Sequence, residues 1–518
     1  TFAIISHPDA GKTTLTEKFL LFGGAINTAG SVKGKANSKY AVSDWMDIEK
    51  ERGISVTSSV LQFNYDGYCI NILDTPGHQD FSEDTYRTLM AADSAVMVID
   101  ASKGVEAQTI KLFKVCVMRH IPIFTFINKM DRDARDTFEL LDDIETVLGI
   151  KTCPVNWPIG SGKEFKGVYD RKTKIVSTFQ AISTGGAKKA EETDYHIDDE
   201  ALKELVGPYL FDQLNEEIEL IDGATEEMDI EKVRAGELSP VFFGSALNTF
   251  GIEQFLNYFL KMTTPPIGRN SSEGIIDPVT EPFSAFVFKI QANMNKAHRD
   301  RIAFMRICSG KFEAGMEVYH AASKRKIKLS QPQQLMAQDR KIVDEAYAGD
   351  VIGVFDPDLF SIGDTLTTGG KKFEYEGIPT FAPEHFCRVV QLNSMKRKQF
   401  VKGVTQIAQE GAIQIFQEYT AGLSEIIVGV VGVLQFDVLK YRLENEYGCE
   451  IRLEPIPYNY IRWVKDPTID VTKLKRVSDV KKVKDMKGNP LLLFANEWVI
   501  DQVLQHNEGL ELEEFRKN

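Results

Sequence analysis

The chain has 518 residues, which is too long for a single hydrophobic core and predicts about three or four domains. Hydrophobic residues make up 43% and charged residues 26%, the proportions of an ordinary globular protein. The formal net charge of −14 excludes a globally basic nucleic-acid-binding protein, so any contact with nucleic acid has to rest on local basic patches.

The six cysteines are scattered and form no C-x-x-C pair. This pattern argues against a zinc site and a disulfide framework, and it favours a reducing cytoplasm. No apolar run approaches the roughly 18 residues that a bilayer crossing requires, so we expect no membrane partner. The chain begins at Thr1 without methionine, and we expect a few natural residues to precede it.

The first motif in the chain is a phosphate-binding loop. The apolar run Phe2 to Ile5 predicts a strand, and Leu15 to Leu21 predicts the first turns of a helix. In such a loop, backbone N–H groups and the helix N-terminus cradle a β-phosphate. Lys12 would reach the β- and γ-phosphates, and the hydroxyl of Thr13 would bind Mg²⁺. The candidate loop comprises Ser6, His7, Pro8, Asp9, Ala10, Gly11, Lys12, Thr13 and Thr14.

Two residues depart from the usual loop pattern. Ser6 stands where the full pattern has glycine, and a residue with a side chain adopts a positive φ only at a cost. Asp9 places an acidic side chain in a site for an anion. Two explanations stay open for Asp9: it caps the following helix, or it helps to hold a cation near the phosphates.

Two segments after the loop are candidates for sensing the nucleotide. Gly23 to Tyr40 is rich in small and polar residues and predicts a mobile loop. Ser43 to Ser55 is either a charged surface helix ending at Gly53 or a switch loop that folds over the γ-phosphate. In the second interpretation, Ser55 is the hydroxyl that binds Mg²⁺.

A hairpin with a functional end follows. Ser58 to Tyr65 and Tyr68 to Leu73 predict two strands joined at Asp66-Gly67. The second strand leads directly into Asp74, Thr75, Pro76, Gly77 and His78. An Asp that closes a buried strand after a phosphate loop is typical of the carboxylate that serves Mg²⁺, usually through water. Gly77 can bring its N–H to a γ-phosphate, and His78 is the candidate catalytic residue, because it would face the attacking water.

The next motif predicts the choice of base. Ala95 to Asp100 and Ile121 to Ile127 predict two strands, and the second leads into Asn128, Lys129, Met130 and Asp131. The Asp131 carboxylate can accept hydrogen bonds from N1–H and the exocyclic amine of guanine, and adenine offers neither donor. Asn128 would meet the O6/N7 edge, and the stem of Lys129 would cover the ring face.

The last base-contacting loop lies far downstream. The best candidate is Ser245, Ala246 and Leu247, with the N–H groups of the last two facing guanine O6. Residues 150–238 predict an inserted subdomain with a strand at Ile175 to Phe179 and a helix from Ala201 to Ile221. Its acidic tract, Glu191 to Glu200, is interpreted as a solvated surface, with protein docking as the alternative.

The pattern changes after a boundary at Thr263 to Pro266. Between Phe283 and Gly370, short alternating strands separated by Gly and Pro turns predict a small β-barrel. Its basic run, residues 324–328, is either a lysine-guarded strand edge or a patch that contacts phosphate. After Pro379, two strand–helix–strand units predict a split α/β domain of the ferredoxin-like kind. The tail beyond Tyr458 has a basic stretch and the apolar segment Leu491 to Phe494, and the pattern assigns neither.

Taken in order, these signatures resemble those of the translational GTPases. Arg52-Gly53-Ile54 and the segment from Asp74 to His78 distinguish that group from signalling GTPases. Over nearly the whole chain, the resemblance is greatest to the bacterial peptide chain release factor 3 family, which is related to elongation factor G. The stretches that carry it are Thr1 to Leu21, Ser43 to Gly53, Asp80 to Thr88, Phe286 to Asp300 and Val428 to Val438.

This resemblance implies a multidomain fold of α/β and β type. We expect a P-loop GTP-binding domain at 1–265 with an insert at about 150–238, a translation-factor β-barrel at 280–375, and a C-terminal α/β domain at 380–518. The implied activity is hydrolysis of GTP to GDP and phosphate with Mg²⁺ as cofactor. The implied partner is the ribosome, from which the protein promotes departure of stop-codon-reading release factors after peptide release. We expect a cytoplasmic protein that is monomeric off the ribosome.

The resemblance also implies roles for residues at matching motif positions. Lys12 and Thr13 would bind phosphate and Mg²⁺, and Ser55 takes the place of a switch threonine. His78 would position the hydrolytic water, and Asn128 and Asp131 would select guanine. No arginine finger is evident in the motifs, so we expect strong activation to come from outside the chain.

Two alternatives compete with this interpretation. An elongation factor G-like ribosome remodeller shares the GTP-binding domain, the insert and the barrel, but the chain leaves little room after one α/β domain for the further domains of a translocase. A guanine-nucleotide-binding scaffold without useful hydrolysis is the second alternative. Intact Lys12, Asp74 and His78 argue against it.

Overall fold

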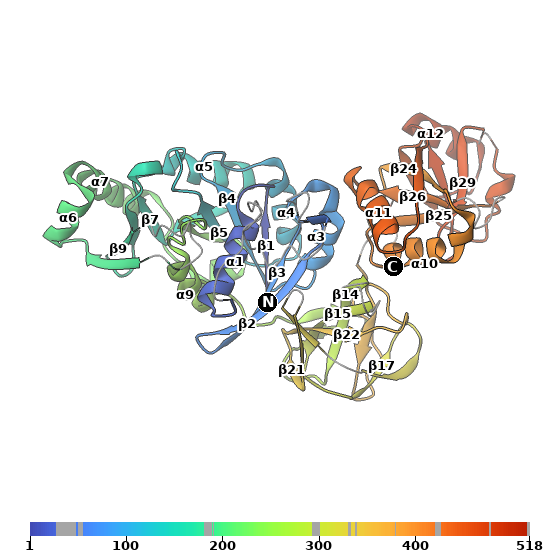
Figure 1. Ribbon diagram of the computed structural model, residues 1–518, viewed down its shortest axis with the longest axis horizontal. Helices are drawn as coiled ribbons and strands as arrows, with labels where there is room; N and C mark the ends of the chain where they lie inside the picture. Colours follow the sequence, from blue (N-terminus) through green and yellow to red (C-terminus); the bar gives the residue numbers. More distant parts are fainter. Residues whose placement is uncertain are drawn as a thin grey trace.

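Three folded units follow one another along the chain (Figure 1). The computed structural model describes residues 1–26, 48–49, 55–180, 189, 191–292, 301–329, 333–336, 339–378, 380–419, 426–475 and 478–514. The first unit is an α/β sheet with an inserted subdomain, the second is a barrel-like β-unit, and the third is α/β. The predicted fold class is confirmed. Most of the two candidate nucleotide-sensing segments, Gly23 to Tyr40 and Ser43 to Ser55, lies outside the described residues.

A seven-stranded sheet in the order β2-β3-β1-β4-β5-β11-β6 forms the first unit. Its strands are β1 (Phe2–Ser6), β2 (Ser59–Tyr65), β3 (Tyr68–Asp74), β4 (Ser94–Asp100), β5 (Ile123–Asn128), β6 (Lys151–Pro154) and β11 (Leu238–Phe243). Its helices are α1 (Lys12–Phe22), α3 (Ser82–Leu89), α4 (Ala107–Met118), α5 (Thr137–Leu148) and α9 (Ile252–Met262). The strands from β3 to β6 in this order are parallel, so their carboxyl ends meet at one edge, where open α/β sheets bind ligands.

The predicted hairpin between β2 and β3 is confirmed. The two strands are antiparallel, and the connecting Asp66 and Gly67 have φ angles of 48° and 79°. Two positive φ angles in a two-residue loop are the requirement of a type I′ turn, which Asp-Gly satisfies. The hairpin places Asp74 directly beside Ile4, so the end of β3 lies next to the phosphate loop.

The insert contributes a second, antiparallel sheet in the order β10-β9-β8-β7. Its elements are β7 (Asn156–Ile159), β8 (Gly167–Asp170), β9 (Ile175–Gln180), β10 (Glu191–His196), α6 (Glu200–Val206), α7 (Pro208–Ala224) and α8 (Ile230–Arg234). The strand predicted at Ile175 to Phe179 is confirmed as β9. The single helix predicted from Ala201 to Ile221 is wrong, because Gly207 has a φ of 87° and Pro208 begins a new helix. The acidic tract forms the mostly exposed edge strand β10, as expected of a solvated surface.

The second unit is antiparallel throughout, with an eight-stranded sheet in the order β18-β17-β23-β14-β15-β22-β19-β20. Its strands are β14 (Ser284–Ala292), β15 (Arg301–Ser309), β16 (Lys311–Glu313), β17 (Glu317–His320), β18 (Arg325–Lys328), β19 (Gln333–Met336), β20 (Asp339–Ile342), β21 (Glu345–Tyr347), β22 (Val351–Phe355) and β23 (Thr365–Thr367). A short hairpin of β12 (Arg269–Ser271) and β13 (Gly274–Ile276) precedes it. The basic run lies on the end strand β18, where Lys326 pairs with Glu317 at 3.0 Å, so the strand-edge interpretation is favoured.

The third unit begins with the predicted ferredoxin-like arrangement. The strands β24 (His385–Gln391), β25 (Gln414–Glu418), β26 (Ile426–Val430) and β27 (Ile451–Pro455) lie in the order β27-β24-β26-β25, with α10 (Arg397–Gln409) and α11 (Leu434–Asn445) between them in sequence. The unassigned tail continues the same sheet through β25 and β29. It supplies β28 (Tyr460–Val464), β29 (Val480–Lys484), β30 (Pro490–Phe494), α12 (Glu497–His506) and β31 (Leu512–Glu513). Within the described part of the chain, no helix combines the length and apolar character needed to cross a bilayer.

Candidate functional site

A cleft of about 670 Å³ opens at the edge where the parallel strands of the first unit end. Its volume lies in the range typical of sites for small molecules. The lining residues that the sequence predicted are Ser6, His7, Pro8, Asp9, Gly11, Lys12, Thr13, Thr14, Ser55, Gly77, His78, Asn128, Lys129, Asp131 and Leu247. The structure therefore brings all the predicted motifs together around one cleft. Predicted residues that do not line it are Ala10, Asp74, Thr75, Pro76, Met130, Ser245 and Ala246.

The phosphate loop joins β1 to α1 in a conformation that depends on Gly11. Gly11 precedes the first residue of α1 and has a φ of 99°, and a side chain at this position would collide with the amide of Asn128. The strain expected at Ser6 is absent, because Ser6 does not have a positive φ. The non-glycine residue of the loop that does have one is Asp9, with a φ of 64°. Asp9 does not occupy the cap position of α1, which is Gly11.

Of the three side chains predicted to serve a metal, Thr13 lies beside Ser55, and Asp74 lies beside Lys12. The Lys12 ammonium forms a buried ion pair with Asp74. The Thr13 and Ser55 hydroxyl oxygens are 3.4 Å apart, and either can donate. Hydroxyl and carboxylate oxygens are the hard ligands that Mg²⁺ prefers, and Mg²⁺ usually takes its remaining ligands from phosphates and water. In the described residues, no cluster of three or more His, Cys, Asp or Glu side chains could hold a metal by itself.

The base-selecting segment is fixed by its own hydrogen bonds. Asn128 Oδ1 accepts from the Ala246 N–H at 2.8 Å, and Asn128 Nδ2 donates to the Ala10 carbonyl at 2.9 Å. Asp131 Oδ1 accepts from the Ser245 hydroxyl at 2.5 Å. The Ala246 N–H was expected to face guanine, but it holds Asn128 instead. Ser245 and Ala246 therefore position the side chains that line the cleft, and Leu247 reaches the cleft itself.

Lys129 connects this segment to the phosphate loop. Its ammonium donates to the Asp9 carbonyl at 2.5 Å and to Asp100 Oδ2 at 2.7 Å. Burial by itself raises the pKa of the Asp100 carboxyl, but hydrogen bonds from Lys129 and Ser102 hold this pKa below its ordinary value. Sequence reasoning missed Asp100, Ser102, Lys103 and Arg132 as lining residues. Asp100 could have been found, because it closes a buried parallel strand as Asp74 does.

His78 stands at the rim of the cleft. Its side chain is 33% exposed, and its Nδ1 lies 3.3 Å from both the backbone nitrogen and Oδ1 of Asp80. Thr75 and Pro76 do not line the cleft, and their hydrogen bonds hold the loop in place. Thr75 donates to the Ile4 carbonyl at 2.7 Å, and the Pro76 carbonyl accepts from Thr85 at 3.2 Å. The backbone around Gly77 passes close to Pro8, which brings the two loops into contact.

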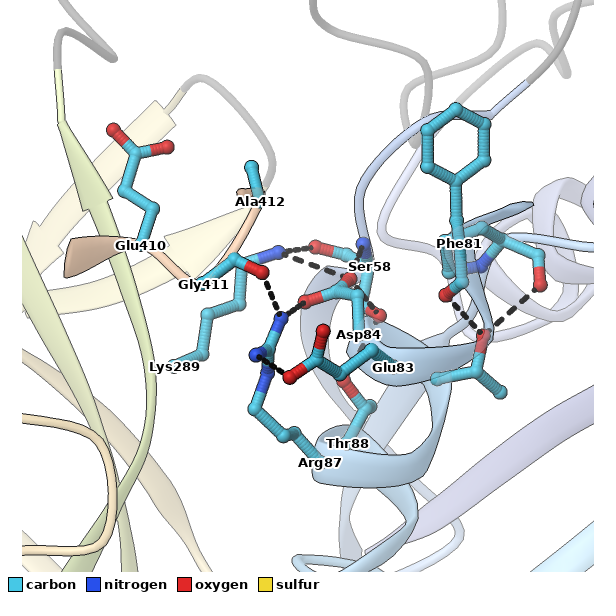
Figure 2. Close-up of polar contacts among 12 residues, drawn as sticks. Ser58, Phe81, Glu83, Asp84, Arg87, Thr88, Lys289, Glu410, Gly411 and Ala412 are labelled. Carbon is cyan, nitrogen blue, oxygen red and sulfur yellow. Dashed lines mark hydrogen bonds and ion pairs between the residues drawn. The ribbon is translucent and has the colours of Figure 1, made fainter. Parts of the chain in front are cut away.

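The helix after His78 contacts both other units, and Figure 2 shows this junction. Arg87 of α3 donates to the Gly411 carbonyl of the third unit at 3.0 Å. Lys289 of β14 donates to the Ser58 carbonyl, and its ammonium lies 3.9 Å from Asp84. Burial lowers the pKa of Lys289, an effect that Asp84 opposes. The sequence carried a weak signal for this contact, because Lys289 is the one charged residue of a strand that is mostly apolar.

Comparison with known proteins finds family models that match all three units of the chain. Models of the elongation factor Tu GTP-binding domain, elongation factor G domain 2 and the class II release factor RF3 C-terminal domain match residues 1–265, 282–369 and 375–504. The chain is 57% identical to peptide chain release factor 3 of Symbiobacterium thermophilum over 98% of this chain and 96% of the relative. It is 54% identical to the protein of the same name from Synechococcus elongatus, over 99% of this chain and 92% of the relative.

A solved structure supports the fold independently. A crystal structure of a protein from Thermus thermophilus matches with a TM-score of 0.70 and 22% sequence identity, covering 89% of this chain and 69% of the other. At this identity, the match bears on the architecture alone.

Proposed function

The chain belongs to the peptide chain release factor 3 family, and from this premise we propose how its residues carry out the family's reaction. It is a translational GTPase of translation termination that binds GTP and GDP. We propose that the ribosome activates it and that it promotes departure of stop-codon-reading release factors after peptide release. One observation carries the assignment: the phosphate loop, His78 and the guanine-selecting segment line one cleft in a chain related to release factor 3 over 98% of its length.

The phosphate end of the cleft binds the β- and γ-phosphates. Lys12 exchanges its ion pair with Asp74 for the phosphate oxygens, and loop N–H groups and the start of α1 contribute further positive charge. The hydroxyls of Thr13 and Ser55, with Asp74 acting through water, would hold Mg²⁺. The bound Mg²⁺ supplies neutralisation of charge on the β- and γ-phosphate oxygens. Asp9, at the mouth of the loop, contributes to holding this cation.

The opposite end of the cleft selects guanine. Asp131 accepts from N1–H and the exocyclic amine, and its second role as acceptor for Ser245 fixes its orientation. Asn128 fixes the loops that surround the base, and the stem of Lys129 covers the ring. The Leu247 N–H faces O6, since the Ala246 N–H is engaged by Asn128.

Hydrolysis depends on the position of one water molecule. His78 orients this water toward the γ-phosphate, and the Gly77 N–H binds the phosphate. Phosphoryl transfer asks little covalent chemistry of a protein, so catalysis consists of positioning and charge stabilisation. Among the described lining residues the one arginine is Arg132, which follows the base-selecting segment. The ribosome provides the strong stimulation of hydrolysis.

We also propose the domain limits and the setting of this activity. The GTP-binding domain spans 1–265 with its insert at about 150–238, the barrel spans 280–375, and the C-terminal domain spans 380–518. The separate antiparallel sheet of β7 to β10 supports the insert, although β6 joins the main sheet. The protein acts in the cytoplasm as a monomer when it is off the ribosome.

The proposed function is tested by watching a fluorescently labelled release factor on ribosomes that carry a stop codon and have released their peptide. Adding this protein with GTP accelerates departure of the label, and omitting the protein leaves departure slow. A parallel assay on ribosomes poised for translocation should show no movement of the messenger RNA. Absence of acceleration in the first assay contradicts the proposed function, and movement in the second revives the elongation factor G-like alternative.

A further inference from the structure

A single carboxylate, Asp80, lies between the candidate catalytic histidine and the C-terminal domain. Asp80 Oδ1 is 3.3 Å from Nδ1 of His78. Asp80 Oδ2 accepts a hydrogen bond from the backbone N–H of Leu434 at 2.8 Å. The Asp80 side chain is 8% exposed, so water does not compete effectively for either oxygen. The two oxygens of one side chain therefore contact two domains.

The C-terminal domain presents the Leu434 N–H from a rigid corner. Leu434 is the first residue of α11, where unpaired N–H groups and the helix dipole favour a carboxylate. The preceding N–H groups of Val431 and Gly432 both donate to Gln435 Oε1 at 3.0 Å. A side chain on Gly432 would overlap Asp80, so the two backbones approach closely at this point.

The segment that carries Asp80 is attached to the C-terminal domain by further contacts. Phe81 belongs to an apolar cluster with Ile48, Val56 and Val438 of α11. Six residues further on, Arg87 donates to the Gly411 carbonyl. This carbonyl belongs to a turn whose next residue, Ala412, accepts from Gln435 at 2.8 Å. The position of Asp80 therefore follows the position of the C-terminal domain.

On the GTP-binding side, Asp80 determines which nitrogen of His78 can face the reaction. Nδ1 has one site in the ring plane: in the neutral ring it accepts from the Asp80 backbone N–H at 3.3 Å, and when it carries a proton it faces the Asp80 carboxylate at the same distance. This leaves Nε2 for water in the cleft, which His78 lines. Which ring nitrogen reacts is set by the hydrogen bond that the other nitrogen makes.

We propose that Asp80 is a positioning residue for His78 and that the C-terminal domain sets its orientation through the Leu434 N–H. This inference rests on the proposed role of His78 in hydrolysis. When the C-terminal domain is docked, the Leu434 N–H holds the Asp80 carboxylate, and the carboxylate holds the imidazole while Nδ1 carries a proton. A shift of that domain changes hydrolysis without any contact between the domain and the nucleotide.

The test is ribosome-stimulated GTP turnover by the full-length protein in five forms: wild type, Asp80→Asn, His78→Ala, the double variant, and Gly432→Ala. Asn at position 80 keeps the size of the side chain and an acceptor for Leu434, but it loses the charge that faces Nδ1. We expect Asp80→Asn to lower kcat about tenfold or more, because misplacement of a catalytic group is costly, with KM unchanged. The same substitution in the His78→Ala background should cause no further loss.

Gly432→Ala tests the contact from the C-terminal domain, because it displaces Asp80 without a substitution in the GTP-binding domain. It should lower kcat in the same direction as Asp80→Asn. The matched control is Gly403→Ala, which crowds Leu443 and Tyr447 inside the C-terminal domain and leaves Asp80 untouched. This control should keep wild-type kcat. Binding of a fluorescent GDP analogue checks that each variant is folded.

The outcomes separate this inference from the proposed function. If His78→Ala turns over GTP like wild type, the proposed role of His78 fails. If His78→Ala is impaired and Asp80→Asn reduces turnover by the same factor in both backgrounds, Asp80 acts independently of His78 and the inference is overturned. Unchanged kcat in Asp80→Asn, or in Gly432→Ala, also overturns it.

Discussion

At the scale of single residues, the polar side chains of the cleft are held in place by hydrogen bonds to neighbouring residues. Ser245 orients Asp131, the Ala246 N–H orients Asn128, and Asp100 orients Lys129. Because these side chains are already ordered before the nucleotide binds, binding costs less conformational entropy. We propose that selectivity for guanine rests on Asp131, because its two carboxylate oxygens match the two donors of guanine.

Asp131→Asn should therefore change base preference. A carboxamide replaces one acceptor by a donor, so two charge-assisted hydrogen bonds to guanine are lost or weakened, and affinity for GTP should fall about a hundredfold. Affinity for xanthosine triphosphate should rise, because its 2-oxo group can accept from the amide. Fluorescence titration with both nucleotides measures the change. Asp133→Asn, the same substitution two positions on, is the control and should bind GTP like wild type.

Lys18 provides a prediction about pH. Burial in α1 lowers the pKa of its ammonium from 10.5 to about 8, an effect that Glu17 opposes. Between these two values the unfolded chain binds a proton that the folded chain does not, so this residue makes the free energy of unfolding rise as pH increases through the window.

Lys18→Met should flatten that rise, and urea unfolding at several pH values between about 8 and 10.5 measures it. Lys261→Met, which removes an exposed lysine from α9, should leave the slope unchanged. Equal slopes in wild type and Lys18→Met would show that burial of Lys18 has no such effect.

At the scale of elements, the tail is part of the C-terminal sheet. β29 pairs with β25, and Trp463, Leu491 and Leu493 pack with Phe386 and Phe416 of the ferredoxin-like half. The tail therefore forms one cooperative unit with the strands before it.

Leu493→Ala, which removes a fully buried side chain, should cost about 2–5 kcal/mol of stability. Hydrogen exchange should speed up in β25 and β26 as well as in β28 to β30. Trp498→Ala on α12, where the side chain is 68% exposed, is the control and should alter exchange little. Faster exchange confined to the tail would mean that the tail folds separately.

Local motifs were predictable from the sequence because their residues are neighbours along the chain, as in the phosphate loop and the turn at Asp66-Gly67. The supporting contacts were not predictable, because each joins residues that the chain places far apart. Ser245 with Asp131 and Asp80 with Leu434 are examples. The break at Gly207-Pro208 could have been predicted, since both residues oppose a continuous helix, but the apolar periodicity on either side outweighed them.

At the scale of the whole molecule, buried charges join the three units. Arg306 of the barrel makes hydrogen bonds of 2.7 and 2.8 Å to both carboxylate oxygens of Asp93 in the GTP-binding domain. Lys289 contacts Ser58, and Glu410 of the C-terminal domain accepts from Gln291 of the barrel at 3.1 Å. Ser58 lies three residues beyond Ser55, so this junction connects the candidate switch segment with the other two units.

Lys289→Met tests this junction. Removing one partner of a buried ion pair should lower the free energy of unfolding by about 3 kcal/mol, because Asp84 loses a nearby positive charge and the Ser58 carbonyl loses its donor. Lys326→Met breaks an exposed ion pair in the same barrel and should change it by less than about 1 kcal/mol. Thermal unfolding of both variants provides the comparison, and equal shifts would contradict the importance of the buried contact.

The central claim, a GTPase triggered by the ribosome through His78, is tested most directly by GTP turnover with and without ribosomes. The account predicts slow turnover by the free protein, strong stimulation by ribosomes, and a loss of about a hundredfold or more in the stimulated rate of His78→Ala with GTP still bound. A rate that ribosomes do not change, or a His78→Ala variant that is stimulated like wild type, would contradict it.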